Sequence, residues 1–376
     1  MTDLNLYPAY EEVFFHERPN RFVMRLRTGD GRLIAAHVPN TGRMEEFCVE
    51  RHPFFVTPVS GGKYAYKVIA TTYHGEYVFL DTIKVNTIFA NMLQQDVLPE
   101  FRGATNIKRE VAVADSTFDF ACTLNQQKTL IEIKSCTLCH NGLAMFPDAP
   151  TVRGQRHLAT LDRLAREGEY VTYVVFLILH AGARRFMPNF HTDLDYAKLF
   201  LASEHVKIKT LRVPVRSPVS VDIGSVREIP VDDAALRANC GNKGSYMLLM
   251  ENTEDINISI GKLGERFFPK GWYVYVGSAL NSLDSRLKRH QRKRKKLFWH
   301  IDYIASTVMK VKKVYPIRRT DRIEAELAQA LEPICDSAVP GFGASDAKES
   351  SHLFYFRATP LRKRAFVDLL FTARTV

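Results

Sequence analysis

The sequence TFDFACTLNQQKTLIEIK, residues 117–134, places charged side chains inside two short apolar runs. Because the side chains of a strand alternate between its faces, Glu132 and Lys134 share one face, and the isoleucines beside them share the other. The polar residues between the runs predict a hairpin that turns at Asn125–Gln126. In that register Asp119 lies directly opposite Glu132. The stretch therefore predicts two carboxylates and an ammonium group converging beside an apolar sheet face.

Two carboxylates held this close repel one another unless a cation binds between them. Oxygen ligands that leave positions open for water suit Mg²⁺, and Mn²⁺ accepts the same ligands. Lys134 would then orient an attacking water or neutralise developing charge. The alternative is an ordinary exposed strand edge, which often carries such charges. The Glu-x-Lys pattern alone does not separate the two interpretations.

Further motifs occur in a fixed order around this pair. RPNRF at residues 18–22 and HVPNTGRM at residues 37–44 precede it, and FPDAPTVRG at residues 146–154 follows it. In order and spacing these motifs resemble the sugar fermentation stimulation protein (SfsA) family over about residues 18–210. The resemblance implies an N-terminal OB-like barrel followed by a PD-(D/E)XK nuclease domain with a restriction-endonuclease-like αβ core, and an association with DNA.

The same resemblance implies roles for individual residues. Asp119, Glu132 and Lys134 match the catalytic motif of the nuclease domain. Glu110 matches an acidic position ahead of it, so the implied metal ligands are Glu110, Asp119 and Glu132. The implied cofactor is Mg²⁺ or Mn²⁺.

Basic residues near the acidic pair are candidates for holding a phosphate backbone. Arg21 and Arg43 lie among short alternating segments over about residues 18–85, which predict a small β-barrel. Aromatic residues of these segments serve either as stacking platforms for nucleic acid or as core. Arg153 and His157 are four residues apart and share one face of a predicted helix. A solvated helix start is the alternative there, and the family motif favours the functional interpretation.

The last third of the chain is strongly basic. Residues 241–376 contain 24 Lys or Arg against 14 Asp or Glu, which accounts for +10 of the net charge of +11. Eight of the eleven residues in RLKRHQRKRKK, residues 286–296, are Lys or Arg. This asymmetry indicates a polyanionic partner, and its binding would depend strongly on salt. The candidate nucleic-acid contacts here are Lys288, Arg289, Arg292 and Lys293.

Motifs around the basic run resemble a sparsely characterised branch of the GIY-YIG nuclease superfamily over residues 243–357. GSY at residues 244–246 and YVG at residues 275–277 correspond to its two signature triplets, and PGFG at residues 340–343 with Ser345-Asp346 also fits. The resemblance implies catalytic roles and one metal ligand. Tyr246 and Tyr275 would help to activate water. Arg286 would stabilise phosphate charge beside His290 on the same helix, and Glu324 would bind the metal.

The length of 376 residues and a hydrophobic fraction of 46% suit two or three packed domains. We predict a multidomain α+β and α/β protein. Residues 1–85 would form an OB-like nucleic-acid-binding domain and residues 86–212 a nuclease-like domain. Residues 213–242 would form a linker without regular elements, and residues 243–376 a GIY-YIG-like basic domain.

The chain shows no targeting signal at its start, and its longest apolar stretch, residues 170–179, is too short to span a bilayer. We therefore expect a cytoplasmic protein without a membrane partner. The motif CTLCH at residues 136–140 matches a haem attachment pattern and also offers zinc ligands. Without an export signal or a second ligand pair, buried reduced thiols are the better interpretation.

These observations predict a metal-dependent nuclease that hydrolyses phosphodiester bonds of DNA in preference to RNA. Its basic C-terminal module would bind the same polymer and is a candidate for a second cleavage centre. The alternative is a non-catalytic, DNA-binding transcriptional regulator of the SfsA type. A scaffold for acidic proteins explains the charge but not the carboxylate pair, and the sequence leaves a homo-oligomer open.

Overall fold

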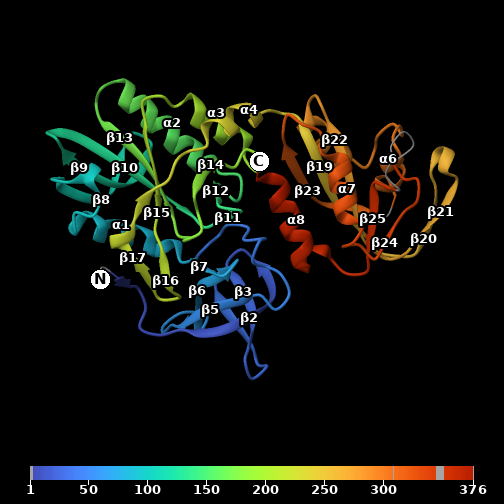
Figure 1. Cartoon of the computed structure of the whole chain (residues 1–376), viewed down its shortest axis with the longest axis horizontal. Coiled ribbons are helices and arrows are strands. Elements are labelled where there is room, and N and C mark those ends of the chain that lie inside the picture. Colours follow the sequence, from blue (N-terminus) through green and yellow to red (C-terminus); the bar gives the residue numbers. More distant parts are fainter. Residues whose placement is uncertain (1–2, 308, 344–350, 376) are drawn as a thin grey trace. The chain divides into compact units, whose positions relative to one another are not determined.

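The computed structural model describes residues 3–307, 309–343 and 351–375. The chain divides into two compact units, Met1–Leu236 and Arg237–Val376 (Figure 1). Within the described part of the chain, no helix is long and apolar enough to cross a membrane. The Ser345-Asp346 motif lies outside the described residues.

The first unit begins with the predicted barrel. Its strands are β2 (Glu11–Asn20), β3 (Val23–Thr28), β4 (Leu33–His37), β5 (Pro53–Pro58), β6 (Tyr66–Tyr73) and β7 (Glu76–Phe79). They are ordered β4-β3-β2-β5-β6-β7, and an additional pairing of β4 with β6 closes the barrel. The alternation in β3 buries Met24 and Leu26 and exposes Arg25 and Arg27. Phe54 and Phe55 are buried, so these two aromatics belong to the core.

A six-stranded sheet forms the second part of this unit, in the order β18-β15-β13-β10-β9-β8. Its strands are β8 (Thr105–Val113), β9 (Ser116–Leu124), β10 (Gln127–Cys136), β13 (Val171–Ile178), β15 (Lys207–Arg212) and β18 (Arg227–Glu228). Helix α1 (Val85–Gln94) packs on one face, while α2 (Val152–Arg166) and α3 (Leu194–Ala202) pack on the other (Figure 1). The central strands β10 and β13 pair in parallel and are covered on both faces, which explains their near-continuous apolar sequences.

The predicted hairpin register is confirmed. Gln127 pairs with Leu124, and the ladder continues to Ile131 and Phe120. Asn125 and Gln126 have φ angles of 48° and 62°, as a two-residue type I′ turn requires. Asp119 and Glu132 are therefore the next residues along this ladder.

The prediction of a linker without regular elements over residues 213–242 was wrong. The segment contains β16 (Val215–Ser217), β17 (Ser220–Asp222), β18 and all of α4 (Asp233–Asn239). Pro214 precedes β16, Pro218 lies in the turn between β16 and β17, and Pro230 follows β18, so none of these prolines interrupts a strand. Strand β17 pairs with β1 (Asp3–Asn5), a partner more than 200 residues away that local signals do not reveal. A small second sheet of β11 (Cys139–His140), β12 (Leu143–Phe146) and β14 (Arg185–Pro188) completes the unit.

The second unit is an antiparallel sheet with helices, ordered β23-β19-β22-β25-β24. Its strands are β19 (Gly244–Asn252), β22 (Gly271–Ala279), β23 (Lys310–Arg318), β24 (Ser337–Ala338) and β25 (Leu353–Phe356), with a hairpin of β20 (Ile256–Ser259) and β21 (Glu265–Phe268). Its helices are α5 (Leu283–Gln291), α6 (His300–Ala305), α7 (Glu324–Leu331) and α8 (Arg364–Arg374). Leu283 and Leu287 of α5 and Ile301 and Ile304 of α6 share a core with the sheet.

Candidate active site and basic surface

Asp119 is held between a helix and the neighbouring strand. Its Oδ1 accepts a hydrogen bond of 2.7 Å from Asn86 Nδ2 on α1, and its Oδ2 accepts one of 2.7 Å from the backbone N–H of Ile133 on β10. The carboxylate therefore reaches across the hairpin to the strand that carries Glu132. No sequence signal pointed to Asn86, because its role depends on where α1 packs.

Glu132 lies at the centre of the site and is 4% exposed. Its Oε1 accepts from Lys134 Nζ at 2.5 Å and from His157 Nδ1 at 2.7 Å. Its Oε2 is buried without a hydrogen-bond partner among the described residues. A buried anionic oxygen without a partner is costly, so this atom is a candidate ligand for a cation.

The two carboxylates differ in their protonation behaviour. Burial, followed by the charge of Glu132, raises the pKa of Asp119. Burial also opposes ionisation of Glu132, but hydrogen bonds and charge from His157 and Lys134 hold its pKa below the usual value. The pair therefore favours one ionised carboxylate beside one that ionises reluctantly. A bound cation would favour ionisation of both.

His157 is placed to orient Glu132. It is 1% exposed, and its Nε2 accepts from Arg153 Nε at 3.3 Å. This hydrogen-bond network assigns the ring proton to Nδ1, which donates to Glu132. The geometry does not favour the predicted phosphate contact for His157. Arg153 is exposed and remains accessible to a phosphate.

Glu110 lies on the edge strand β8 and is exposed. The pairs Arg109–Phe120 and Val111–Phe118 flank it, so Glu110 stands at the register position across from Asp119. The three acidic positions thus occupy adjacent strands β8, β9 and β10. This placement keeps Glu110 a candidate for the rim of a metal site.

Two further residues fix the surroundings of the site. Asp193 is the N-cap of α3, and it also accepts from the backbone N–H of Thr151 at 2.8 Å and from Gln155 Nε2 at 2.9 Å. It therefore fixes the first turn of α2, the helix that carries Arg153 and His157. Thr151 caps the same helix by accepting from the backbone N–H of Gly154.

The barrel residues predicted to bind nucleic acid lie at the surface. Arg21 and Arg43 are exposed, and the Arg21 guanidinium lies 4.7 Å from the centroid of the Phe22 ring. Arg18 has a different role, because its two terminal nitrogens donate to four backbone carbonyls. It stabilises the loop that contains Arg43.

In the second unit, Tyr246 and His290 form a buried pair. Tyr246 Oη lies 2.9 Å from His290 Nε2, and the Tyr275 ring centroid is 6.3 Å from each of the other two rings. Burial raises the pKa of Tyr246 and of Tyr275 and, with the nearby charge of Lys295, lowers that of His290 to about 4. Three of the predicted residues are therefore brought together.

Gly277 allows this cluster to form. It pairs with Tyr246, and a Cβ atom at residue 277 would lie 2.4 Å from Tyr246 Oη.

We expect Gly277→Ala to destabilise the second unit by about 1–3 kcal/mol, because the buried ring has no room to move. Denaturant unfolding followed by tryptophan fluorescence measures this. Gly241→Ala is the control, because a Cβ atom there makes only ordinary van der Waals contact. Gly264 is unsuitable, because its φ of 71° would strain an alanine. Equal midpoints for the variants at residues 277 and 241 would contradict the expectation.

Glu324 and Arg286 already have partners within the unit. Glu324 accepts from Ser278 Oγ and, at 2.6 Å, from Arg322, while His352 Nδ1 lies 3.0 Å from its other oxygen. Burial opposes its ionisation, but these groups lower the pKa of Glu324 to about 2. Arg286 donates to the Ser278 carbonyl at 2.7 Å. The predicted metal ligand is therefore ionised, but its oxygens are engaged.

The basic run divides into structural and exposed residues. Arg289 forms two hydrogen bonds of 2.8 Å with buried Asp302, so the geometry does not favour its predicted role as a nucleic-acid contact. Lys288, Arg292 and Lys293 are exposed, as their predicted role requires. The sequence could not separate these classes, because Asp302 lies beyond the run.

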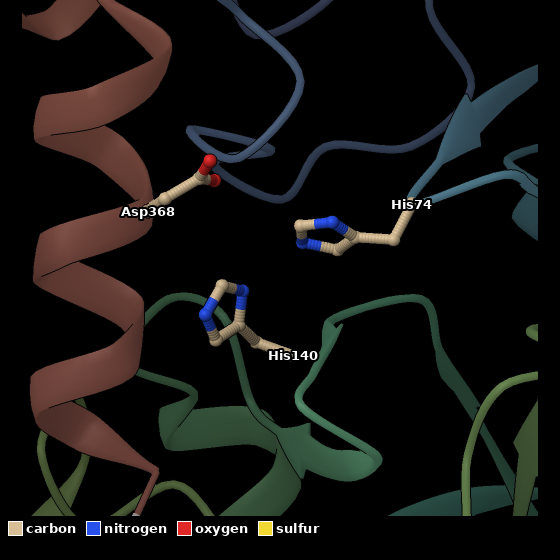
Figure 2. A group of neighbouring side chains, drawn as sticks. All are labelled: His74, His140 and Asp368. Carbon is tan, nitrogen blue, oxygen red and sulfur yellow. The ribbon is translucent and has the colours of Figure 1, made fainter.

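The two cysteines of the CTLCH motif lie in the interior of the first unit. Cys136 and Cys139 are buried and form no disulfide, and burial raises the pKa of Cys139 to about 12. His140 Nδ1 lies 2.8 Å from Tyr73 Oη, and the His140 and His74 ring centroids are 5.3 Å apart (Figure 2). Asp368, also labelled in Figure 2, belongs to α8 in the second unit. Two imidazoles supply only half of a tetrahedral zinc site.

Comparison with known proteins identifies three segments. Residues 17–80 match the SfsA N-terminal OB domain, residues 84–217 match the sugar fermentation stimulation protein RE domain, and residues 245–373 match the domain of unknown function DUF123. These matches confirm the predicted OB-like barrel, the SfsA domain and a separate C-terminal αβ module.

Individual relatives agree with these matches. The chain is 35% identical to a sugar fermentation stimulation protein homolog of Desulforamulus reducens, over 50% of this chain and 77% of the relative. It is also 35% identical to the homolog of Methanothermobacter thermautotrophicus, over 48% of this chain and 75% of the relative. The solved structure of Pyrococcus furiosus SfsA in complex with Ca²⁺ is 30% identical, with a TM-score of 0.55, and the match covers 61% of this chain and 99% of that chain. The chain therefore belongs to the sugar fermentation stimulation protein family.

Proposed function

We propose that this protein is a metal-dependent nuclease that hydrolyses phosphodiester bonds of DNA. The single observation that carries the proposal is the buried oxygen Glu132 Oε2, which lacks a hydrogen-bond partner in the described residues. It belongs to a carboxylate whose charge raises the pKa of neighbouring Asp119, and an amine is bound to its other oxygen. A buried and a half-buried carboxylate beside a lysine suit metal-assisted hydrolysis better than they suit a structural core.

The residues present fit a hard divalent cation. Asp119 and Glu132 would hold Mg²⁺ or Mn²⁺ through carboxylate oxygens, with Glu110 as a further candidate ligand. A relative crystallised in complex with Ca²⁺ gives additional support, because Ca²⁺ prefers the same oxygen ligands. When bound, the metal would polarise the scissile phosphate and lower the pKa of an attacking water.

The protein's own side chains would orient and stabilise the reacting groups. Lys134, bound to Glu132 Oε1, places a positive charge beside the carboxylate pair, where it would stabilise charge that develops on the phosphate. His157 helps to fix the orientation of Glu132 by donating to the same oxygen as Lys134, and Arg153 in turn fixes His157. Asn86 keeps the Asp119 carboxylate directed at β10. This preorganisation reduces the rearrangement needed when substrate binds.

We assign nucleic-acid binding to the second unit. Its exposed cations suit a phosphate backbone, and binding through them would weaken steeply with salt. Because both Glu324 oxygens are already engaged, the geometry supports binding by this unit better than a second cleavage centre.

A cleavage assay tests the proposal. Purified full-length protein is incubated with end-labelled single- and double-stranded DNA, and with RNA, in Mg²⁺, Mn²⁺ or EDTA. We expect products with the divalent ions and none in EDTA, with DNA cut faster than RNA. Absence of cleavage with every metal and substrate would contradict the proposal.

The alternative is a DNA-binding transcriptional regulator without turnover, which the exposed basic residues of the second unit favour. A regulator of this kind would bind DNA with the same affinity in Mg²⁺ and in EDTA, and Glu132→Gln would leave that affinity unchanged. Binding titrations under both conditions, beside the cleavage assay, separate the two functions.

Thermal unfolding provides a test without turnover. We expect Asp119→Asn to raise the stability of the metal-free protein by about 0.5–2 kcal/mol, because it removes a half-buried carboxylate next to the buried carboxylate of Glu132. The same change should remove most of the rise in Tm that Mn²⁺ gives the wild type. Asp96→Asn, an exposed position on the same unit, is the control. An equal Mn²⁺ shift in wild type and Asp119→Asn would contradict the metal assignment.

A further inference from the structure

Phe298 is the most exposed aromatic side chain in the described part of the chain, at 74%. It lies two residues after the basic run, between α5 and α6. An apolar ring left in water forgoes the stabilisation that burial would give. Single exposed apolar residues are common on proteins, so exposure alone does not indicate a binding site. The support for one comes from how the backbone of this residue is held and from what surrounds the ring.

The backbone under Phe298 is fixed by a buried carboxylate. The N–H groups of Phe298 and Trp299 both donate to Asp302 Oδ2 at 3.0 Å. Asp302 is 0% exposed, and Arg289 holds it through two bonds of 2.8 Å. A side chain on such a backbone loses little conformational freedom when it binds a partner.

The neighbouring aromatic residue is already occupied. The Arg286 and Arg289 guanidinium groups each lie 4.4 Å from the Trp299 ring centroid. Trp299 also contacts Phe298, with ring centroids 5.3 Å apart and planes at 90°. This perpendicular contact supports the Phe298 ring from the side while most of its surface stays in water.

The charge around the ring defines the chemistry of its partner. Arg292, Lys293, Arg294 and Lys296 are all exposed within the six residues before Phe298. Closely spaced cations favour a polymer that brings several negative charges, and an exposed ring among them suits a flat π-system on that polymer. Single-stranded nucleic acid provides both, since each phosphate accompanies a base and stacking tolerates any sequence.

We propose that Phe298 is a stacking platform for an unpaired nucleobase, and that the second unit therefore prefers single-stranded segments or strand ends over intact duplex. The inference rests on the proposed nucleic-acid function and specifies its substrate class. In a duplex the bases are already stacked on one another, so the ring gains this contact only where pairing is absent. The exposed cations would bind both forms, because they contact phosphate alone.

Fluorescence anisotropy of the full-length protein tests the inference, in EDTA so that no substrate is cut. The probe is a fluorescein-labelled 20-nucleotide oligothymidylate. We expect Phe298→Ala to weaken binding by about tenfold, and Phe298→Trp to retain it within about twofold, as loss and conservation of one stacked base predict. Phe267→Ala is the matched control, because Phe267 is 61% exposed in the same unit but lies on β21. It should bind like the wild type.

Two additional probes identify the contact. An oligomer of the same length with abasic sites carries the phosphates but no bases, and on it wild type and Phe298→Ala should bind equally. The wild type should bind a blunt duplex more weakly than it binds the single strand. Wild type and Phe298→Ala should bind this duplex with equal affinity. Melting curves of each variant establish that the second unit is folded.

Some outcomes would overturn the inference. Unchanged binding of oligothymidylate by Phe298→Ala would contradict stacking, and so would an equal loss on the abasic oligomer, which would indicate a contact to the backbone. Either result leaves nucleic-acid binding itself intact. If the wild type binds none of the three probes even at low salt, both this inference and the proposed function of the second unit fail.

Discussion

Glu132→Gln is expected to lower the single-turnover rate of metal-dependent DNA cleavage by about 10³-fold or more. The substitution keeps the shape of the side chain but removes the charge that a divalent ion requires. A loss of about 4 kcal/mol of metal-dependent stabilisation of the transition state corresponds to this factor. It also removes the anionic partner of Lys134 and His157, so the orientation of both groups is weakened.

The measurement uses excess enzyme over labelled DNA at saturating Mn²⁺, so that the rate reports on cleavage and not on product release. Lys134→Met should lower the same rate by about 10²–10³-fold, the effect of removing one charge-stabilising donor. Glu167→Gln, whose native side chain is 41% exposed at the end of α2, is the matched control and should cleave normally. A rate for Glu132→Gln within tenfold of the wild type would show that this carboxylate is not needed.

The second large effect concerns stability. Asp302→Ala should destabilise the second unit by about 3–5 kcal/mol, because it leaves buried charge without its partner. Arg289 would lose a bidentate ion pair, and Lys295, whose side chain is 3% exposed and lies 3.9 Å from Asp302, would lose its nearby anion. The backbone N–H groups of Phe298 and Trp299 would lose their acceptor as well.

Intrinsic fluorescence isolates this effect within the full chain. The protein has two tryptophans, Trp272 and Trp299, and both lie in the second unit. Denaturant unfolding followed by their emission therefore reports on that unit. Asp321→Ala is the control, because Asp321 is 52% exposed and its ion pair with Arg319 should contribute less than about 1 kcal/mol. A similar midpoint for both variants would contradict the role assigned to Asp302.

The same carboxylate predicts a sensitivity to acid. Burial opposes ionisation of Asp302, but its hydrogen bonds, chiefly from Arg289, lower its pKa below the ordinary 3.8. A carboxyl group whose pKa is lowered by folding stabilises the folded state at every pH above its ordinary pKa. This stabilisation is lost as the pH falls through the pKa of the folded state. The difference in stability between wild type and Asp302→Ala should therefore shrink as the pH falls below 3.8.

The sequence was most informative where a pattern is local. The hairpin of β9 and β10 was predictable in register, because the alternation of apolar residues and a two-residue turn determine it together. The position of Asp119 relative to Glu132 followed directly. The cap at Thr151 similarly follows from its own side chain and the next three residues.

Prediction was poorer where a role depends on a distant partner. The spacing of Arg153 and His157 indicated a shared helix face, but only packing of α2 on the sheet directs His157 into Glu132. Strand β17 pairs with β1 at the other end of the unit, and no local signal indicates this pairing. The prolines near β17 suggested an irregular segment instead. In the basic run, Asp302 lies thirteen residues after Arg289, and charge counting could not distinguish this paired arginine from exposed Arg292.

We propose that Asp119 and Glu132 together hold a divalent metal ion, on which cleavage depends. Anomalous diffraction from crystals of the full chain soaked in Mn²⁺ tests it most directly, with Glu132→Gln crystals as the control. We expect an anomalous peak about 2.0–2.6 Å from Glu132 Oε2 and from an Asp119 oxygen, and none there in the control. A fully occupied Mn²⁺ elsewhere in the wild-type crystals, with no peak between these two carboxylates, would contradict it.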